Sequence, residues 1–324
     1  MNRTVALLLL LLAGCSRPGS LEPNLAAEEG YFTGADSARL FYRAIGRGRD
    51  TVVVVHGFQG NNQNYLAPDL LPLARGRTLL FYDQRGAGRS SPVSDPAQLG
   101  IEAHVRDVEA LRQHFRLERL SLLGHSGGAA IVARYAVAHP GRTARLVLVT
   151  PPPPVREPFS EQTMRAFFPR VDSATWVRVN ALQASLPTAQ DPVSVCQDIT
   201  RAVLPHAYFA NPANAERMRG DFCASPPEKL RTQAQRTAAF QQSLPADWRP
   251  SLRPLRVPVL VIHGAHDAIP LAASRAWVQA LPDARLLVLP SADHLPWVEQ
   301  PEQFISAVDQ FFRGNWPVGA EIVR

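Results

Sequence analysis

The chain has 324 residues, of which 46% are hydrophobic and 19% are charged. These values are ordinary for a globular protein and exclude a disordered, collagen-like or coiled-coil chain. The formal net charge is +6, but the cations are scattered and Lys229 is the only lysine, so we expect no nucleic-acid partner. Three cysteines without a C-x-x-C pair argue against a disulfide-built scaffold, and we expect no metal and no cofactor.

The first fifteen residues have the features of an export signal. Arg3 precedes an apolar run, Val5–Ala13, that is too short to cross a bilayer as a helix. The run ends in Leu-Ala-Gly-Cys, which resembles the bacterial lipobox, where the signal peptide is cut before a cysteine that becomes lipidated. This resemblance implies a lipid anchor on Cys15, a tether over residues 16–30, and an outer-membrane location if the source is Gram-negative. An ordinary cleaved signal is the alternative.

Export changes the interpretation of the two remaining cysteines. Cys196 and Cys223 would lie in a compartment where disulfides persist, and a bond between them would stabilise the fold by roughly 3 kcal/mol. Two buried free thiols are the alternative, and the sequence leaves both possibilities open.

Strands and helices alternate from residue 31 to residue 150. The helical patterns are Ile101–Phe115 and Ala129–His139. Thr51–Val55 and Leu79–Tyr82 are uninterrupted runs that suit strands buried on both faces, and the alternation of strands with helices predicts a mostly parallel sheet with helices on both faces. The predicted strands are Tyr31–Phe32 and Arg39–Arg43, which form a hairpin, followed by Thr51–Val55, Leu79–Tyr82, Leu120–Leu123 and Leu146–Val149.

Four consecutive prolines, Pro151–Pro154, interrupt this alternation and predict a stiff, extended exit from the sheet. The next hundred residues contain no strong strand pattern and two helical stretches, Glu161–Phe168 and Lys229–Phe240. We therefore expect a helical cap over residues 151–249, inserted into a core of residues 31–150 and 250–316. The core is completed by the strands Val259–Ile262 and Leu286–Leu289 and by an amphipathic helix over Phe304–Phe312.

A glycine-rich turn carries the candidate nucleophile. The strand Leu120–Leu123 leads into Gly124-His125-Ser126-Gly127-Gly128, and a helix follows. A G-x-S-x-G sequence in this context is typical of a nucleophile elbow, where the serine occupies a strained turn and the glycines allow backbones to approach. We expect the Ser126 hydroxyl to stand above the sheet edge, with the amide of Gly127 placed to stabilise an oxyanion.

A serine hydroxyl needs a base, and that base needs an orienting acid. Asp267 comes just after one predicted strand and His294 just after the next. The carboxyl ends of parallel strands share one sheet edge, so the sequence predicts that Ser126, Asp267 and His294 converge there as a catalytic triad. Asp293 is adjacent to His294 and cannot easily aim its carboxylate at that ring. The other candidate bases, which we expect to be structural, are His56, His125, His139, His263 and His266.

The second oxyanion donor is expected on the loop His56–Gly60, which follows the strand Thr51–Val55. The small residues of this loop let its backbone approach a substrate carbonyl, and the donor would be the amide of Phe58. His56 itself would brace the loop by hydrogen bonding.

Taken together, the segments HGFQG, GHSGG, HGAHD and a late DH, each after a strand, resemble the α/β-hydrolase superfamily over residues 31–313. The resemblance implies an α/β-hydrolase fold and a serine hydrolase that forms an acyl-enzyme from a small-molecule or peptide substrate. The segment Asp83–Ser90 resembles the DQRGxGRS segment of proline iminopeptidases, which implies an aminopeptidase of that type. From the residues alone the segment is structural, with Asp83 and Arg85 paired beside the elbow.

Two features depart from the proline iminopeptidase pattern, since those enzymes usually have HGGPG in place of HGFQG and an aromatic residue in place of Gly127. They also hold the substrate's free amine with acidic cap residues. An esterase or lactonase acting on small lipophilic esters is the alternative, favoured by the Phe-rich cap stretch that contains Phe167. A non-catalytic binding lipoprotein and a cofactor-free oxidase or peroxidase are further alternatives. The candidate acidic cap residues are Glu157, Glu161, Asp191, Asp198, Glu216 and Glu228, and the phenylalanines are Phe159, Phe167 and Phe168.

Overall fold

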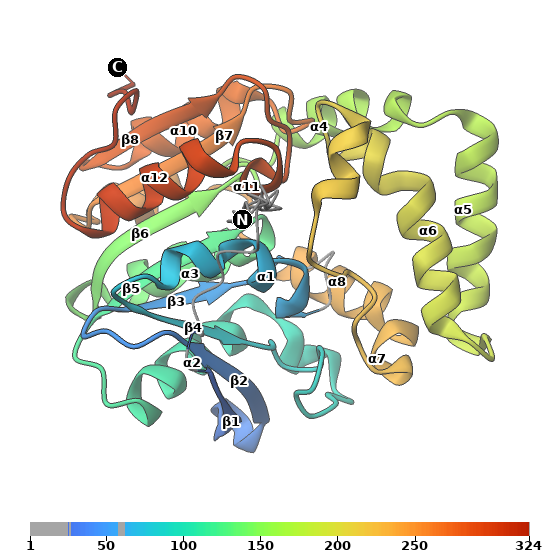
Figure 1. Cartoon of the computed structure of the whole chain (residues 1–324), viewed down its shortest axis with the longest axis horizontal. Coiled ribbons are helices and arrows are strands. Elements are labelled where there is room, and N and C mark those ends of the chain that lie inside the picture. Colours follow the sequence, from blue (N-terminus) through green and yellow to red (C-terminus); the bar gives the residue numbers. More distant parts are fainter. Residues whose placement is uncertain (1–24, 26, 58–61, 324) are drawn as a thin grey trace, which may run out of the picture.

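The computed structural model describes residues 25, 27–57 and 62–323 (Figure 1). The predicted signal peptide, the predicted lipidation site Cys15 and the predicted oxyanion donor Phe58 lie outside these residues. The predicted tether, residues 16–30, extends too far, because residues 27–30 belong to a strand, Ala27–Thr33. This strand pairs in antiparallel register with the strand Arg39–Ile45, from Ala27 opposite Ile45 to Thr33 opposite Arg39.

One sheet of eight strands forms the centre of the molecule, in the spatial order β1-β2-β4-β3-β5-β6-β7-β8. Strand β2 is antiparallel to both of its neighbours, and the ladders from β4 to β8 are all parallel. The strands are β1 (Ala27–Thr33), β2 (Arg39–Ile45), β3 (Thr51–Val55), β4 (Thr78–Tyr82), β5 (Leu120–His125), β6 (Thr143–Val149), β7 (Val259–Gly264) and β8 (Ala284–Leu289).

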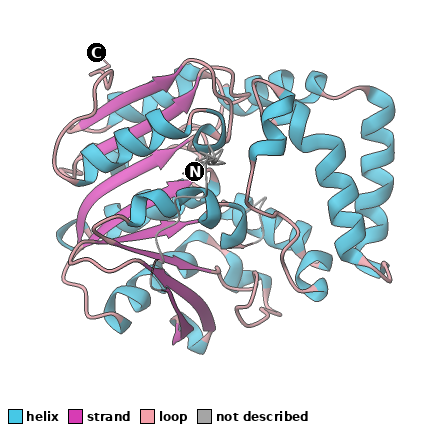
Figure 2. Ribbon diagram, in the orientation of Figure 1, coloured by secondary structure: helices cyan, strands magenta, loops and turns pink. Residues whose placement is uncertain are grey.

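Helices cover both faces of this sheet (Figure 2). One face packs against α2 (Ile101–His114), α3 (Gly127–Ala138) and α10 (Leu271–Ala280). The other face packs against α1 (Ala67–Leu70), α11 (Pro296–Glu299) and α12 (Pro301–Phe312). The inner strands are buried on both sides, as continuous valine and leucine runs require. This arrangement confirms the predicted mostly parallel sheet with helices on both faces.

A helical cap lies between β6 and the short helix α9 (Arg249–Leu252), on the right in Figure 1, beyond the carboxyl ends of the parallel strands. The predicted helical stretch Lys229–Phe240 is present as two helices, because the backbone leaves the helical conformation at Thr232. The cap helices are α4 (Phe159–Phe167), α5 (Ser173–Ser185), α6 (Pro192–Ala207), α7 (Pro227–Arg231) and α8 (Gln233–Ser243).

The two crossings between core and cap run side by side. The backbone N–H of Arg156 donates to Ala246 at 2.9 Å, and that of Trp248 donates to Pro154 at 2.8 Å. Within the cap, Cys196 on α6 forms a disulfide with Cys223, which precedes α7. None of the described helices combines the length and the apolar character needed to span a bilayer.

Candidate active site

Ser126 occupies a sharp turn between β5 and α3. Its backbone angles, φ 50° and ψ −123°, are rare for a residue with a side chain, and such strain is typical of functional turns. The glycines on either side make the turn possible, since a Cβ at Gly124 would overlap the backbone of Gly128, and a Cβ at Gly128 would overlap the carbonyl of Val55. The local geometry is therefore that of the elbow expected from G-x-S-x-G.

Asp267 and His294 meet beyond the carboxyl ends of β7 and β8. His294 Nδ1 lies 2.9 Å from Asp267 Oδ2, and both side chains are buried. Burial lowers the pKa of His294, but the charge and hydrogen bond of Asp267 outweigh burial and raise it above its ordinary value. Burial raises the pKa of Asp267, but the charge and hydrogen bond of His294, together with the His263 charge and the Ile269 backbone N–H, lower it by more, and the net shift is downward. The pair therefore favours an ionised carboxylate that holds the imidazole by Nδ1.

The other ring nitrogen of His294, Nε2, is then the atom available to accept a proton. Ser126 and His294 line the same cavity, although no hydrogen bond joins their side chains among the interactions of the described residues. Catalytic hydrogen bonds are often long in unliganded enzymes and tighten when substrate binds. The site thus brings the predicted nucleophile, base and acid to one sheet edge.

Gly127 is the first residue of α3, so its N–H has no acceptor within the helix and is free to stabilise an oxyanion. The N–H of Gly57 is already used, because it donates to Tyr65 Oη at 2.6 Å. The second predicted donor, Phe58, follows directly in the sequence and lies outside the described residues.

His125 does more than the local packing that the sequence indicated. Tyr65 Oη lies 2.6 Å from His125 Nδ1, and His125 Nε2 lies 3.1 Å from the carbonyl oxygen of His294. Burial, and then the nearby His294, lower the pKa of His125 well below its ordinary value, so its ring is neutral. A chain of hydrogen bonds therefore runs from Gly57 through Tyr65 and His125 to the backbone of His294, the predicted base. Sequence reasoning missed Tyr65.

The His294 ring bonds to Asp267, and the Asp293 carboxylate has other partners. Its Oδ1 accepts from the backbone N–H of His294, and its Oδ2 lies 2.5 Å from the Arg170 guanidinium of the cap. Burial, and then the charge of Asp267, raise its pKa to about 7 in spite of Arg170. Asp293 thus links the loop that carries His294 to Arg170 of the cap.

The remaining histidines have structural partners. His263 bonds to Ser274, and His139 packs against Tyr135 at the end of α3. His266 is exposed, and its backbone carbonyl accepts from Arg170. His56 accepts at Nε2 from the backbone N–H of Gln84, as expected for a residue that braces the loop.

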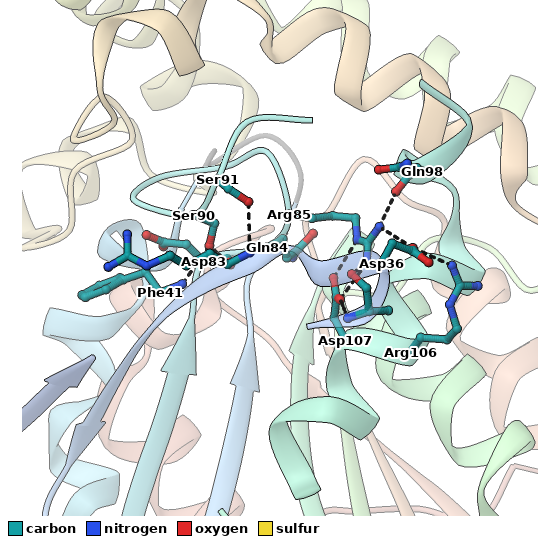
Figure 3. A network of polar contacts seen from close by, with 12 residues as sticks. Asp36, Phe41, Asp83, Gln84, Arg85, Ser90, Ser91, Gln98, Arg106 and Asp107 are labelled. Carbon is teal, nitrogen blue, oxygen red and sulfur yellow. Dashed lines mark hydrogen bonds and ion pairs between the residues drawn. The ribbon is translucent and has the colours of Figure 1, made fainter. Parts of the chain in front are cut away.

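The predicted pair of Asp83 and Arg85 is wrong (Figure 3). Asp83 accepts from the backbone N–H groups of Gln63 and Arg89, whereas Arg85 forms two hydrogen bonds of 2.7 Å with Asp107. Asp107 lies on α2 and offers both carboxylate oxygens to the guanidinium, a fit that the loop itself cannot provide. The segment Asp83–Ser90 is therefore structural, and its buried ion pair is formed by Arg85 with Asp107 of α2.

A cavity of about 930 Å³ opens from the triad into the cap. None of its described lining residues is Asp or Glu. The six acidic cap candidates named from the sequence are all exposed, and none lines the cavity. Across the described part of the chain, no cluster of three or more His, Cys, Asp or Glu residues is arranged to hold a metal ion.

Residues 50–301 match the alpha/beta hydrolase fold family, and the chain belongs to that family. A proline iminopeptidase of Levilactobacillus brevis is 26% identical over 299 residues, which cover 86% of this chain and 94% of that protein. A hydrolase of Pseudomonas aeruginosa has a similar crystal structure, with a TM-score of 0.65 and 25% identity over 89% of this chain and 98% of that one. An esterase of Exiguobacterium antarcticum has a TM-score of 0.65 at 20% identity, covering 89% of this chain and 100% of that one.

Proposed function

We propose that this chain is a serine hydrolase that cleaves a carboxylic ester or amide through an acyl-enzyme on Ser126. The observation that carries the proposal is the arrangement at the sheet edge. Ser126 stands in a strained elbow on the same cavity as His294, whose Nδ1 is held by the buried Asp267 at 2.9 Å. These are the geometric roles by which a triad is recognised.

In the proposed reaction, His294 Nε2 takes the proton of Ser126 as Oγ bonds to the substrate carbonyl carbon. The Gly127 N–H stabilises the resulting oxyanion, and Asp267 stabilises the imidazolium. The imidazolium then gives its proton to the leaving alcohol or amine as the bond from carbonyl carbon to leaving group breaks. Water repeats the sequence on the acyl-enzyme and releases the acid, which restores Ser126.

Esters are the first candidate substrates, because a peptide's free amine would find no carboxylate on the described walls of the cavity. Aromatic and aliphatic side chains of the cap, among them Phe167, Trp176 and Leu204, suit a lipophilic group instead. An aminopeptidase of the proline iminopeptidase type is the second candidate, favoured by the relative from Levilactobacillus brevis. Parallel assays with short-chain aryl esters and a prolyl arylamide separate the two.

The test of the nucleophile is covalent labelling by a fluorophosphonate probe, with the modified peptide identified by mass spectrometry. We expect label on Ser126 and none in Ser126→Ala. Ser291→Ala is the matched control, since Ser291 is exposed on the loop that precedes His294 and should leave labelling unchanged. Label on any other residue, or no label on a folded wild-type protein, would overturn the proposal.

The same proposal includes export and a lipid anchor on Cys15. It is supported by the apolar run that ends in Leu-Ala-Gly-Cys. It is also supported by the disulfide between Cys196 and Cys223, because such bonds are rare in a reducing cytosol. Metabolic labelling with an alkyne fatty acid tests it in a bacterial host. Incorporation into the membrane fraction should be lost in Cys15→Ser, and a wild-type chain that takes up no label would contradict the anchor.

A further inference from the structure

The cap cavity has an uneven distribution of charge. Arg231 is the only Lys or Arg among its described lining residues, and none of those residues is acidic. Residues 58–61, which lie outside the described part, contain no Asp or Glu in the sequence. Apart from the histidines beside Ser126, the described walls of the cavity therefore carry one charged side chain, and that charge is positive.

Arg231 is available to a ligand. It is the last residue of α7 and is half-buried, and its one hydrogen bond among the described residues goes from a terminal guanidinium nitrogen to the Ala189 carbonyl at 2.8 Å. It takes part in no ion pair within the described ranges. Glu228, the nearest acidic residue in the sequence, is exposed, and Asp191, two residues after Ala189, caps α6 instead. Most of its N–H donors are thus left for another acceptor.

Two further cations lie near Arg231 in the sequence, although neither lines the cavity. Lys229 and Arg236 lie on the same segment, and both are buried. Burial, and then the charge of Arg236, lower the pKa of Lys229 to about 8. A carboxylate that reached Arg231 would meet a guanidinium able to bind it through two parallel hydrogen bonds.

The size and lining of the cavity indicate a long substrate. A volume of about 930 Å³ is at the upper end for small-molecule sites and far exceeds what a single prolyl group fills. Its walls include apolar side chains such as Trp176, Ile199 and Val203 together with the amides of Asn180 and Gln241. Ser126 and Arg231 line the same cavity from the core and from the cap, so one molecule can contact both.

We propose that Arg231 is a binding site for a carboxylate carried by the substrate at a distance from its scissile ester. This inference rests on the proposed function and names its substrate class, an elongated apolar ester with an anionic group at the end remote from the reacting carbonyl. The same site disfavours substrates that carry a cation there.

The test compares three p-nitrophenyl esters with one chain length and different ends: octanoate, suberate monoester with its free carboxylate, and 8-aminooctanoate. In the wild-type protein we expect kcat/KM for the carboxylate ester to exceed that of the ammonium ester by about a hundredfold. In Arg231→Gln the carboxylate ester should lose about tenfold, while the octanoate ester changes less than twofold. In Arg231→Glu the order of the charged esters should reverse.

The octanoate ester reports on folding and chemistry in every variant, because it has no charged end. Arg178→Gln is the matched control for loss of one positive charge, since Arg178 is an exposed cap residue that does not line the cavity. It should leave all three esters unchanged. Equal loss of the carboxylate ester in Arg178→Gln, or no discrimination between charged esters in wild type, would overturn the inference. Failure to hydrolyse any ester would instead count against the proposed function.

Discussion

At the scale of single residues, we expect the pair of His294 and Asp267 to set the pH dependence of the proposed reaction. The proposed base is the neutral ring, so kcat/KM should rise with pH as His294 loses its proton. Because the Asp267 carboxylate raises the pKa of His294 above its ordinary value, the inflection should lie above pH 6.5. Activity should therefore fall on the acidic side of that inflection.

The Asp267→Asn variant tests this account. Loss of the negative charge should move the inflection to lower pH, and the wrong ring tautomer should reduce kcat by ~10⁴. The measurement is a pH profile of kcat/KM for an aryl ester in both proteins. An inflection that stays in place in Asp267→Asn would mean that His294 is not the titrating group.

Tyr65 is a positioning residue at the same scale. Tyr65→Phe removes the acceptor of the buried Gly57 N–H and the partner of His125, so we expect a loss of about 1–3 kcal/mol in the free energy of unfolding. We also expect kcat to fall more than KM changes, since the oxyanion loop starts at Gly57. Urea unfolding and steady-state kinetics provide the two measurements.

Tyr82→Phe is the matched control for Tyr65→Phe. The Tyr82 hydroxyl is buried and has no hydrogen-bond partner within the described residues, so its removal should leave stability and kcat nearly unchanged. If both variants behaved alike, the hydrogen bonds of Tyr65 would have no special role.

The convergence of Ser126, Asp267 and His294 could be predicted from the sequence for a physical reason. Ser126, Asp267 and His294 each follow an apolar run, and parallel strands deliver their carboxyl ends to one edge. Tyr65 was not readable, because its contact with His125 joins residues 60 positions apart and follows no short motif. The prediction of Asp83 as the partner of Arg85 was wrong for the same reason, because the actual partner, Asp107, lies on a separate helix.

At the scale of elements, the ion pair of Arg85 and Asp107 attaches the loop after β4 to α2. Both side chains are fully buried. Asp107→Asn keeps the shape but leaves the guanidinium without its main counter-charge, so we expect a loss of about 3 kcal/mol in the free energy of unfolding. Urea denaturation measures this loss.

Asp36→Asn is the control for the buried pair. Asp36 also contacts Arg85, at 3.2 Å, but its side chain is 38% exposed. Asn tolerates the positive φ of this position, so the variant should cost less than about 1 kcal/mol. Equal losses in the two variants would show that burial does not control the strength of these pairs.

The core elements could be predicted more closely than those of the cap. Strand β3 matches its predicted residues Thr51–Val55, because a strand buried on both faces must be apolar throughout. The cap helices α5 and α6 were not predicted. Val179 is the only buried residue of α5, so that helix shows no clear apolar stripe, and Pro205 interrupts the helical sequence of α6.

At the scale of the whole molecule, Arg170 links the cap to the two loops that carry Asp267 and His294. Its guanidinium contacts the Asp293 carboxylate and the backbone carbonyls of His266 and Ala207. Arg170→Gln should weaken these contacts between cap and core and raise KM for a long ester by about tenfold, with a smaller effect on kcat. A short acetate ester, which needs less of the cap, should be affected less.

Arg165→Gln is the control for Arg170→Gln. Arg165 lies on α4 close to Arg170 in sequence, but its only ion pair within the described residues is an exposed one with Glu161. We expect no change in KM for either ester. A similar rise in KM in both variants would assign the effect to cap charge rather than to the contact with Asp293.

The paired crossings between core and cap have a consequence for how this chain can be remodelled. Pro154 and Trp248 are hydrogen-bonded neighbours although 94 positions separate them in the sequence, so the insertion begins and ends at almost one point. A segment whose two ends lie close together can be replaced by another segment while the strands of the sheet keep their positions. A different cap could thus be grafted to change the substrate range, provided that it keeps a contact like that of Arg170 with the Asp293 carboxylate.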